Sequence, residues 1–170
     1  MSQRVMIIGV GESGKSGLAR KLIAEAGLPF YVRDPIMSEW AGACLVTDDN
    51  DEFKRAVMSD ERPRIAVWDE AMEGLGVGDK QNHIFFTRWR HHAILPIAIA
   101  QRYTMIAPNL RVNATDLYIF ETGRKDCEMI ADEYNCPEII GAVDFIAGDF
   151  FHFQKKDDNG KKSLTRHRLW

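Results

Sequence analysis

The sequence predicts a three-layer α/β sandwich around a mostly parallel sheet, with a C-terminal β-hairpin. Three observations predict it. Short apolar segments alternate with segments of helical spacing, a glycine-rich turn joins the first apolar segment to the first helical one, and an Asp-Asn-Gly turn separates two alternating segments near the end. At 170 residues with 45% hydrophobic content, the chain suits a single domain, residues 1–170.

The first half of the chain contains three strand-like segments and two helical ones. Residues 4–10 are apolar and end in glycines, as a buried parallel strand does. Leucine and isoleucine then recur at helical spacing over residues 16–25. Residues 28–32 (LPFYV) predict a second strand, residues 50–58 a helix with an acidic start, and residues 64–68 (RIAVW) a third strand.

The second half continues the alternation. The glycines of residues 73–79 predict a mobile loop, and residues 81–92 a helix rich in aromatic and basic residues. Residues 95–100 and 116–120 are apolar strands, and residues 125–134 fit a helix behind them. Residues 150–154 and 163–168 flank the turn at Asp158-Asn159-Gly160 and predict the hairpin.

Composition excludes several classes of protein. No run of about 18 apolar residues occurs, so no membrane span is expected, and the start of the chain lacks a signal-peptide layout. Three cysteines without C-x-x-C spacing argue against a disulfide framework and a structural zinc site, and predict reduced core thiols. The formal net charge of −3 gives no overall basic footprint, so any nucleic-acid contact is local.

The turn MIIGVGESGKSG, residues 6–17, fits two incompatible motifs. Gly9 to Gly14 spell the G-x-G-x-x-G of a dinucleotide-binding turn, and Asp34 stands where that motif wants an acid for the ribose. Gly9 to Ser16 spell G-x-x-x-x-G-K-S, the phosphate-binding P-loop. Lys15 and Ser16 favour the P-loop, since lysine reaches the β- and γ-phosphates and serine ligates Mg²⁺.

The strand IAVW, followed by Asp69 and Glu70, supports the same choice. A P-loop ATPase needs a carboxylate there to hold Mg²⁺, which we assign to Asp69. A second carboxylate beside it can act as general base on the attacking water, which we assign to Glu70. The expected fold is therefore that of a P-loop NTPase, RecA/FtsK-like. The residues expected to bind the nucleotide are Gly9, Gly11, Glu12, Ser13, Gly14, Lys15, Ser16 and Gly17, with Ser16 and Asp69 as metal ligands.

Other P-loop classes fit less well. A GTPase is expected to carry N-K-x-D and an ABC-type ATPase an LSGGQ-like signature, and the sequence has neither. A small-molecule phosphotransferase remains an alternative, although it does not need a Glu after the metal-binding Asp. Gln101 ends the strand at residues 95–100, where an amide can contact both the γ-phosphate and the attacking water.

At this point the chain resembles the FtsK/HerA superfamily of P-loop motor ATPases, and within it the viral and phage genome-packaging ATPases. In those, the P-loop and the apolar-DE strand are followed by a helix ending in Arg-His, a strand ending in Gln, and a segment resembling P-x-x-R-x-N-A. Arg90-His91, Gln101 and residues 108–114 (PNLRVNA) fit this order. The resemblance spans roughly residues 4 to 135.

The resemblance implies an ATP- and Mg²⁺-dependent motor that translocates double-stranded DNA without sequence preference, as a hexameric or pentameric ring. A capsid portal or vertex protein is an implied partner, and the host cytoplasm or the virion the implied location. Lys15, Glu70, Gln101 and Arg111 are the expected catalytic residues. Arg111 is the first candidate for a finger supplied by the neighbouring subunit, followed by Arg88, Arg102 and Arg124.

Two segments are candidates for gripping DNA. One is the glycine loop at residues 74–80, which ends in Lys80, and the other is the hairpin with Lys155, Lys156, Lys161 and Lys162. An assembly or secretion ATPase that acts on protein or membrane partners is the alternative within the same superfamily.

Overall fold

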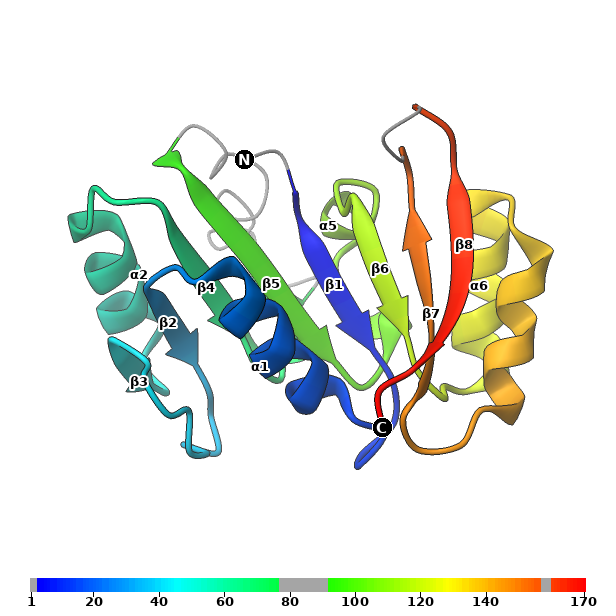
Figure 1. Ribbon diagram of the computed structural model, residues 1–170, viewed down its shortest axis with the longest axis horizontal. Coiled ribbons are helices and arrows are strands. Elements are labelled where there is room, and N and C mark those ends of the chain that lie inside the picture. Colours follow the sequence, from blue (N-terminus) through cyan, green and yellow to red (C-terminus); the bar gives the residue numbers. More distant parts are fainter. Residues whose placement is uncertain (1–2, 77–91, 157–159) are drawn as a thin grey trace.

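The computed structural model describes residues 3–76, 92–156 and 160–170. Within these residues the sheet has eight strands, in the order β3-β2-β4-β5-β1-β6-β7-β8 (Figure 1). The strands from β3 to β6 in this order pair in parallel, and β7 and β8 extend the sheet as antiparallel strands. Their bounds are β1 Val5–Ile8, β2 Phe30–Arg33, β3 Leu45–Thr47, β4 Arg64–Trp68, β5 Ile94–Ala100, β6 Asp116–Ile119, β7 Asp149–Gln154 and β8 Ser163–Arg168.

Helices cover both faces of the sheet, which makes the three layers (Figure 1). Helix α1 (Lys15–Ala26) packs on one face. Helices α2 (Asn50–Ser59) and α6 (Arg124–Tyr134) and the 3₁₀ segment η3 (Pro137–Asp144) pack on the other. The shorter elements α3 (Met72–Leu75), η2 (Tyr103–Met105) and α5 (Pro108–Arg111) also lie on this second face.

The central strands are apolar because they are covered on both sides. Every residue of β1, β4 and β5 is buried. Side chains of alternate residues enter two separate cores: Met6 and Ile8 join the core under α2 and α6, whereas Val5 and Ile7 join the core under α1. This burial fixes the register of β1, and with it the position of the turn that follows.

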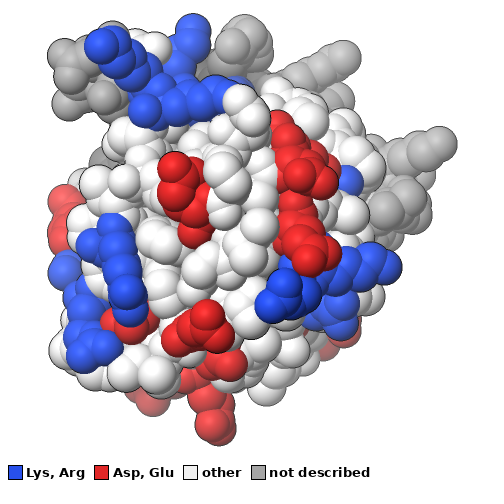
Figure 2. Space-filling view, turned by 90° about the vertical axis from the view of Figure 1, so that its right-hand side faces the viewer, with Lys and Arg blue, Asp and Glu red and all other residues white. Residues whose placement is uncertain are grey.

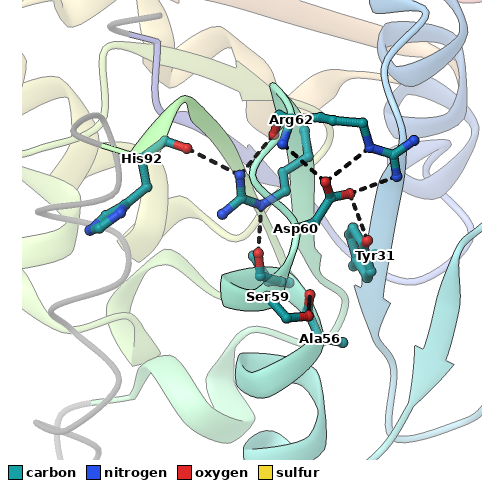
Figure 3. A network of polar contacts seen from close by, with 8 residues as sticks. Tyr31, Ala56, Ser59, Asp60, Arg62 and His92 are labelled. Carbon is teal, nitrogen blue, oxygen red and sulfur yellow. Dashed lines mark hydrogen bonds and ion pairs between the residues drawn. The ribbon is translucent and has the colours of Figure 1, made fainter.

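A polar network joins α2 to the strands at the amino edge of β4 (Figure 3). The Asp60 carboxylate accepts from the Tyr31 hydroxyl at 2.8 Å and from two nitrogens of Arg62 at 2.9 and 2.8 Å. The guanidinium of Arg62 holds the pKa of Asp60 well below its usual range. Buried Arg64 donates to the carbonyls of Arg62 and His92, at 2.7 and 3.2 Å. These contacts lie at the sheet edge opposite the candidate site.

Most predicted elements are present within two residues of their expected bounds, including the C-terminal hairpin. The sequence analysis missed β3 and η3. The expected mobile loop at residues 73–79 is wrong for its first part, because Gly74, Leu75 and Gly76 are buried and Gly76 bridges to Ile106. The rest of this loop, residues 77–79, lies outside the described residues. The same holds for the expected helix at 81–92, of which only His92 is described.

The sequence analysis also predicted reduced core thiols and no membrane span. Cys44, Cys127 and Cys136 are free thiols, but only Cys127 is buried and Cys44 is exposed, so the expectation of three core thiols is wrong. In the described part of the chain, no helix has the length and hydropathy needed to cross a membrane.

Candidate nucleotide-binding site

The glycine-rich turn at residues 9–14 joins β1 to α1 at the carboxyl edge of the parallel sheet. Its first two amides are held by the neighbouring strands: Gly9 N donates to Ala100 O at 3.2 Å, and Val10 N donates to Glu121 O at 2.9 Å. The turn is thus seated across the ends of β5 and β6, with β1 between them. In open parallel sheets, ligands bind outside the carboxyl ends of the strands.

Two glycines in this turn are required by geometry. Gly14 has φ 111° and immediately precedes α1, in a conformation that side chains with a Cβ rarely adopt. A Cβ on Gly9 would lie 2.7 Å from the Phe120 Cβ and 2.8 Å from the Ser13 Oγ. Both positions therefore need glycine for the turn to curl back onto the start of α1, where free backbone amides favour anions.

The side chain of Lys15 folds back onto the glycine-rich turn that precedes it. Its Nζ donates to the carbonyl of Val10 at 2.6 Å, and the side chain is buried. Burial lowers the pKa of Lys15, while the carboxylates of Glu70 and Asp69 act in the opposite direction. The ammonium is thus held over the concave side of the turn, where a polyphosphate would place its negative oxygens.

Asp69 and Glu70 follow β4 and face this turn. The Ser16 hydroxyl lies 3.4 Å from Asp69 Oδ2. Burial raises the pKa of Asp69, with further contributions of the same sign from Asp34 and Glu70. Glu70 has φ 50°, an uncommon conformation for a residue with a Cβ, and its amide donates to Asp69 Oδ1 at 3.0 Å. The chain thus turns sharply directly after β4, with the two carboxylates adjacent in the sequence.

Gln101 completes the group. It follows β5, the strand beside β4, and its Nε2 donates to Glu70 Oε1 at 2.9 Å. The structure therefore brings together the predicted residues Lys15, Ser16, Asp69, Glu70 and Gln101 from three separate segments.

Asp34 is not available to bind a ribose. It is 1% exposed, and its carboxylate accepts from the amides of Ile36 and Ser38, both at 2.9 Å, and from the indole of Trp40 at 3.2 Å. These bonds lower its pKa despite the opposing effect of burial. The carboxylate organises its own loop, which removes the strongest argument for a dinucleotide site.

The donor set fits Mg²⁺ held jointly with phosphates. Ser16 and Asp69 offer only oxygen ligands, and Mg²⁺ is commonly held by one or two protein oxygens together with substrate phosphates. Within the described residues, no group of three or more His, Cys, Asp or Glu side chains could hold a metal without such help. The Ser13 hydroxyl is buried beside the turn without a hydrogen-bond partner, so the turn also has an unsatisfied polar group to offer a ligand.

Arg111 is buried and paired within its own chain. It is 7% exposed, its Nη2 lies 3.2 Å from Glu133 Oε1, and its guanidinium carbon lies 4.8 Å from the centroid of the Tyr103 ring. The side chain ties α5 to α6 on the second face of the sheet. This geometry favours a structural role for Arg111 over the expected role as a trans finger.

Two of the other candidate arginines remain available. The side chain of Arg102, directly after Gln101, is 52% exposed and its Nε bonds to buried Asp126 at 2.9 Å. The side chain of Arg124, at the start of α6, is 71% exposed and lies 4.0 Å from Glu128. Arg88 lies outside the described residues, as do Arg90 and His91.

Two of the candidate DNA-gripping lysines bind backbone carbonyls of their own chain. Lys155 donates to the carbonyl of Val112 and lies over the ring of Tyr134, and Lys162 donates to the carbonyl of Tyr134 at 3.0 Å. Lys156 and Lys161 are exposed, and Lys80 lies outside the described residues. Figure 2 shows this side of the molecule, where basic side chains form separate groups with acidic and neutral ones between them.

Sequence reasoning missed Leu169 and Trp170 as neighbours of the P-loop. The two side chains lie against Gly14, as measured from the position that a Cβ would occupy there. Trp170 is nonetheless 68% exposed. No local pattern signals this contact, because it joins the last residues to the first loop of the fold.

No protein-family model matches the chain, and no curated sequence is similar enough to count as a relative. Solved structures are similar in fold. The genome-packaging NTPase B204 of Sulfolobus turreted icosahedral virus 2, in complex with AMPPCP, matches with TM-score 0.80 and 15% identity over 99% of this chain and 97% of that one. The cytoplasmic domain of the type VII secretion ATPase EccC of Thermomonospora curvata matches with TM-score 0.66 and 12% identity, over 98% of this chain and 25% of that one.

The N-terminal domain of zonular occludens toxin from Neisseria meningitidis matches with TM-score 0.57 and 14% identity, over 99% of this chain and 95% of that one. All three identities are low, so these likenesses establish the fold and nothing finer. The chain has the P-loop NTPase fold, in the arrangement found in the viral packaging NTPase B204.

Proposed function

We propose that the chain hydrolyses ATP and couples the hydrolysis to translocation of double-stranded DNA, as in genome packaging. The hydrogen bond between Gln101 and Glu70 is the observation that carries the hydrolytic part, because it orients a carboxylate at the open edge of the sheet beside Lys15 and Asp69. A phosphotransferase would direct such a carboxylate at the hydroxyl of an acceptor and not at water, which the phosphate-release experiment below distinguishes. The full-length likeness to B204 supports the motor role.

Each residue of the site has a role in this reaction. Backbone amides of residues 9–17 bind the phosphates, and Lys15 contacts the β- and γ-phosphate oxygens. Ser16 and Asp69 would hold Mg²⁺, which, when bound, neutralises charge on the phosphates. Glu70 accepts a proton from the attacking water, whose oxygen bonds to the γ-phosphorus as the bond to the β-phosphate oxygen breaks. Gln101 keeps the Glu70 carboxylate directed at that water.

A ring assembly would complete the site. In the described part of the chain, Lys15 donates to the phosphate-binding turn itself, and a P-loop core gains on the order of 10³ to 10⁵ in rate when an arginine finger is added. Exposed Arg124 and Arg102 are the candidates to cross into a neighbouring subunit. A capsid portal or vertex protein is the proposed docking partner of the ring.

The proposal is tested by phosphate release from ATP, measured with and without double-stranded DNA of two unrelated sequences. Both sequences should stimulate release equally, and the stimulation should fall steeply with salt because phosphate contacts release counterions. Turnover that ignores DNA and needs a small acceptor would identify a phosphotransferase.

A second candidate has support of its own. The likeness to the secretion ATPase EccC extends over 98% of this chain, so an ATPase acting on a protein partner fits the same site. Hydrolysis that DNA leaves unchanged, with no requirement for a small acceptor, would favour this candidate over the motor.

A further inference from the structure

Residues Leu169 and Trp170 leave the sheet at the end of β8 and run to the P-loop, so that the end of the chain lies beside the turn after β1 (Figure 1). Two backbone hydrogen bonds hold them there. Leu169 N donates to Gly148 O at 2.9 Å, and Gly148 N donates to Ser13 O at 3.0 Å. The segment is thus linked through Gly148 to the phosphate-binding turn itself.

The indole of Trp170 occupies a slot between two glycines. Its Cη2 lies 2.9 Å from the position that a Cβ on Gly14 would take, and its Cε2 lies 2.9 Å from the corresponding position on Gly148. Both glycines have positive φ, 111° and 90°. Side chains at either position would close the slot, so the backbone on both sides is shaped to admit one edge of the ring.

The rest of the ring faces solvent. Trp170 is 68% exposed although one edge is held, whereas Trp40 and Trp68 are buried. Burial of apolar area does not explain a large aromatic ring fixed at one edge and open on its outer surface. A ring in that position is suited to stack on a second flat group.

The direction of a bound nucleotide places its base on this side. Asp69, Glu70 and Gln101 follow β4 and β5, so the terminal phosphate lies toward those strands. A nucleotide extended across the turn would then place its nucleoside on the other side of β1, toward β6, β7 and β8. Leu169 lies on that side, with its Cδ2 3.4 Å from the Cβ position of Gly17, in the first turn of α1.

From this geometry we propose that Trp170, held by Leu169 and the two glycines, stacks on the nucleobase of the bound nucleoside triphosphate. This inference rests on the proposed nucleotide site and names the residue that recognises the base. Stacking uses the face of the ring and not hydrogen bonds to base edges, so it favours a nucleobase without selecting one base strongly.

The test compares two ligands: a non-hydrolysable β,γ-methylene analogue of ATP, and inorganic tripolyphosphate, which lacks a base. Dissociation constants are measured by calorimetry for the wild type, Trp170→Ala, Trp170→Phe and Lys15→Ala. Trp170→Ala should weaken binding of the ATP analogue about five- to hundredfold and leave tripolyphosphate unchanged. Trp170→Phe should retain affinity within about threefold, because its ring still stacks.

Met58→Ala, which removes an exposed apolar side chain from α2, is the matched control and should change neither constant. A second readout is the emission of Trp170, obtained by subtracting the tryptophan emission of Trp170→Phe from that of the wild type. The ATP analogue should quench this emission, and tripolyphosphate should not.

Failure of this inference and failure of the proposed function give different results. If the wild type binds neither ligand, the nucleotide site itself is wrong. If the wild type binds both and Trp170→Ala binds the ATP analogue equally well, the stacking role is wrong. If Trp170→Ala binds both ligands equally more weakly, the indole only supports Gly14. If Trp170→Ala changes the oligomer size without changing the affinity, the ring belongs to a subunit contact. Either result overturns the inference.

Discussion

The side-chain amide of Gln101 donates to the carboxylate of Glu70 at 2.9 Å, across the ends of two adjacent parallel strands. Glu70 has a left-handed backbone conformation, φ 50°, and the hydrogen bond from Gln101 orients its carboxylate. In the proposed mechanism Glu70 is the base, and Gln101 holds its carboxylate in place.

Replacing Glu70 by Gln should stop hydrolysis and preserve ATP binding. The substitution removes the base but keeps the shape of the side chain and the metal ligand Asp69, so turnover should fall about 10²- to 10⁴-fold with an unchanged dissociation constant. Single-turnover phosphate release and calorimetry measure the two quantities. Glu73→Gln is the control, since Glu73 is an exposed neighbour paired with Arg33, and it should retain activity. Full turnover in Glu70→Gln would reject the assignment of the base.

Replacing Gln101 by Ala should lower kcat with little effect on KM. The carboxylate of Glu70 loses its orienting donor, so it is no longer held toward the attacking water. We expect kcat to fall about ten- to hundredfold. Gln154→Ala, which removes an amide bonded to Asp116 at 3.2 Å on the outer part of the sheet, is the comparison variant. A rise in KM alone would show that Gln101 binds the nucleotide and does not position Glu70.

Asp69→Asn and Ser16→Ala should each raise the Mg²⁺ concentration needed for half-maximal turnover. The two oxygens lie 3.4 Å apart and would share the ion, so loss of either weakens its hold by on the order of tenfold. Titration of phosphate release with Mg²⁺ at fixed ATP measures the shift. Unchanged titrations in both variants would place the ion elsewhere.

Arg111→Ala should destabilise the fold. Removing the buried guanidinium leaves a cavity against Tyr103 and takes the ion-pair partner from Glu133, which keeps its hydrogen bond from the Tyr103 hydroxyl; the loss costs roughly 1–3 kcal/mol of the free energy of unfolding. Urea unfolding monitored by circular dichroism checks this value. Arg124→Ala, at an exposed position, should stay within about 0.5 kcal/mol of the wild type. A fully stable but inactive Arg111→Ala protein would restore Arg111 as a functional arginine.

Mixing experiments test which arginine crosses between subunits. Subunits with Arg124→Ala are mixed with Lys15→Ala subunits, and the same is done with Arg102→Ala. If one arginine acts in trans, mixed rings contain intact composite sites and recover part of the activity. Absence of recovery at every mixing ratio, for both arginines, would leave the candidates among residues outside the described part of the chain.

Local sequence patterns were sufficient to predict the core of the fold and most of the site. The P-loop, the strand before Asp69 and the strand before Gln101 each carry a local signal, and parallel topology necessarily brings their carboxyl ends together. Strand β3 was missed because three residues show no measurable period.

Tertiary contacts decide the features that the local sequence does not predict. Arg111 has the same local sequence whether it faces solvent or Glu133, and only the packing of α5 on α6 decides between the two. Gly74 and Gly76 look like loop residues, yet Leu75 between them is fully buried and holds them in place. The contact of Trp170 with Gly14 joins opposite ends of the chain, so no window of sequence contains it.

The most direct test of the central claim is calorimetric titration of the purified protein with ATP and Mg²⁺, repeated with Lys15→Ala, and with phosphate release measured on the same samples. The account predicts that the wild type binds ATP and releases phosphate, and that Lys15→Ala does neither. Tight binding of a nicotinamide or flavin dinucleotide, with no uptake of ATP, would contradict it.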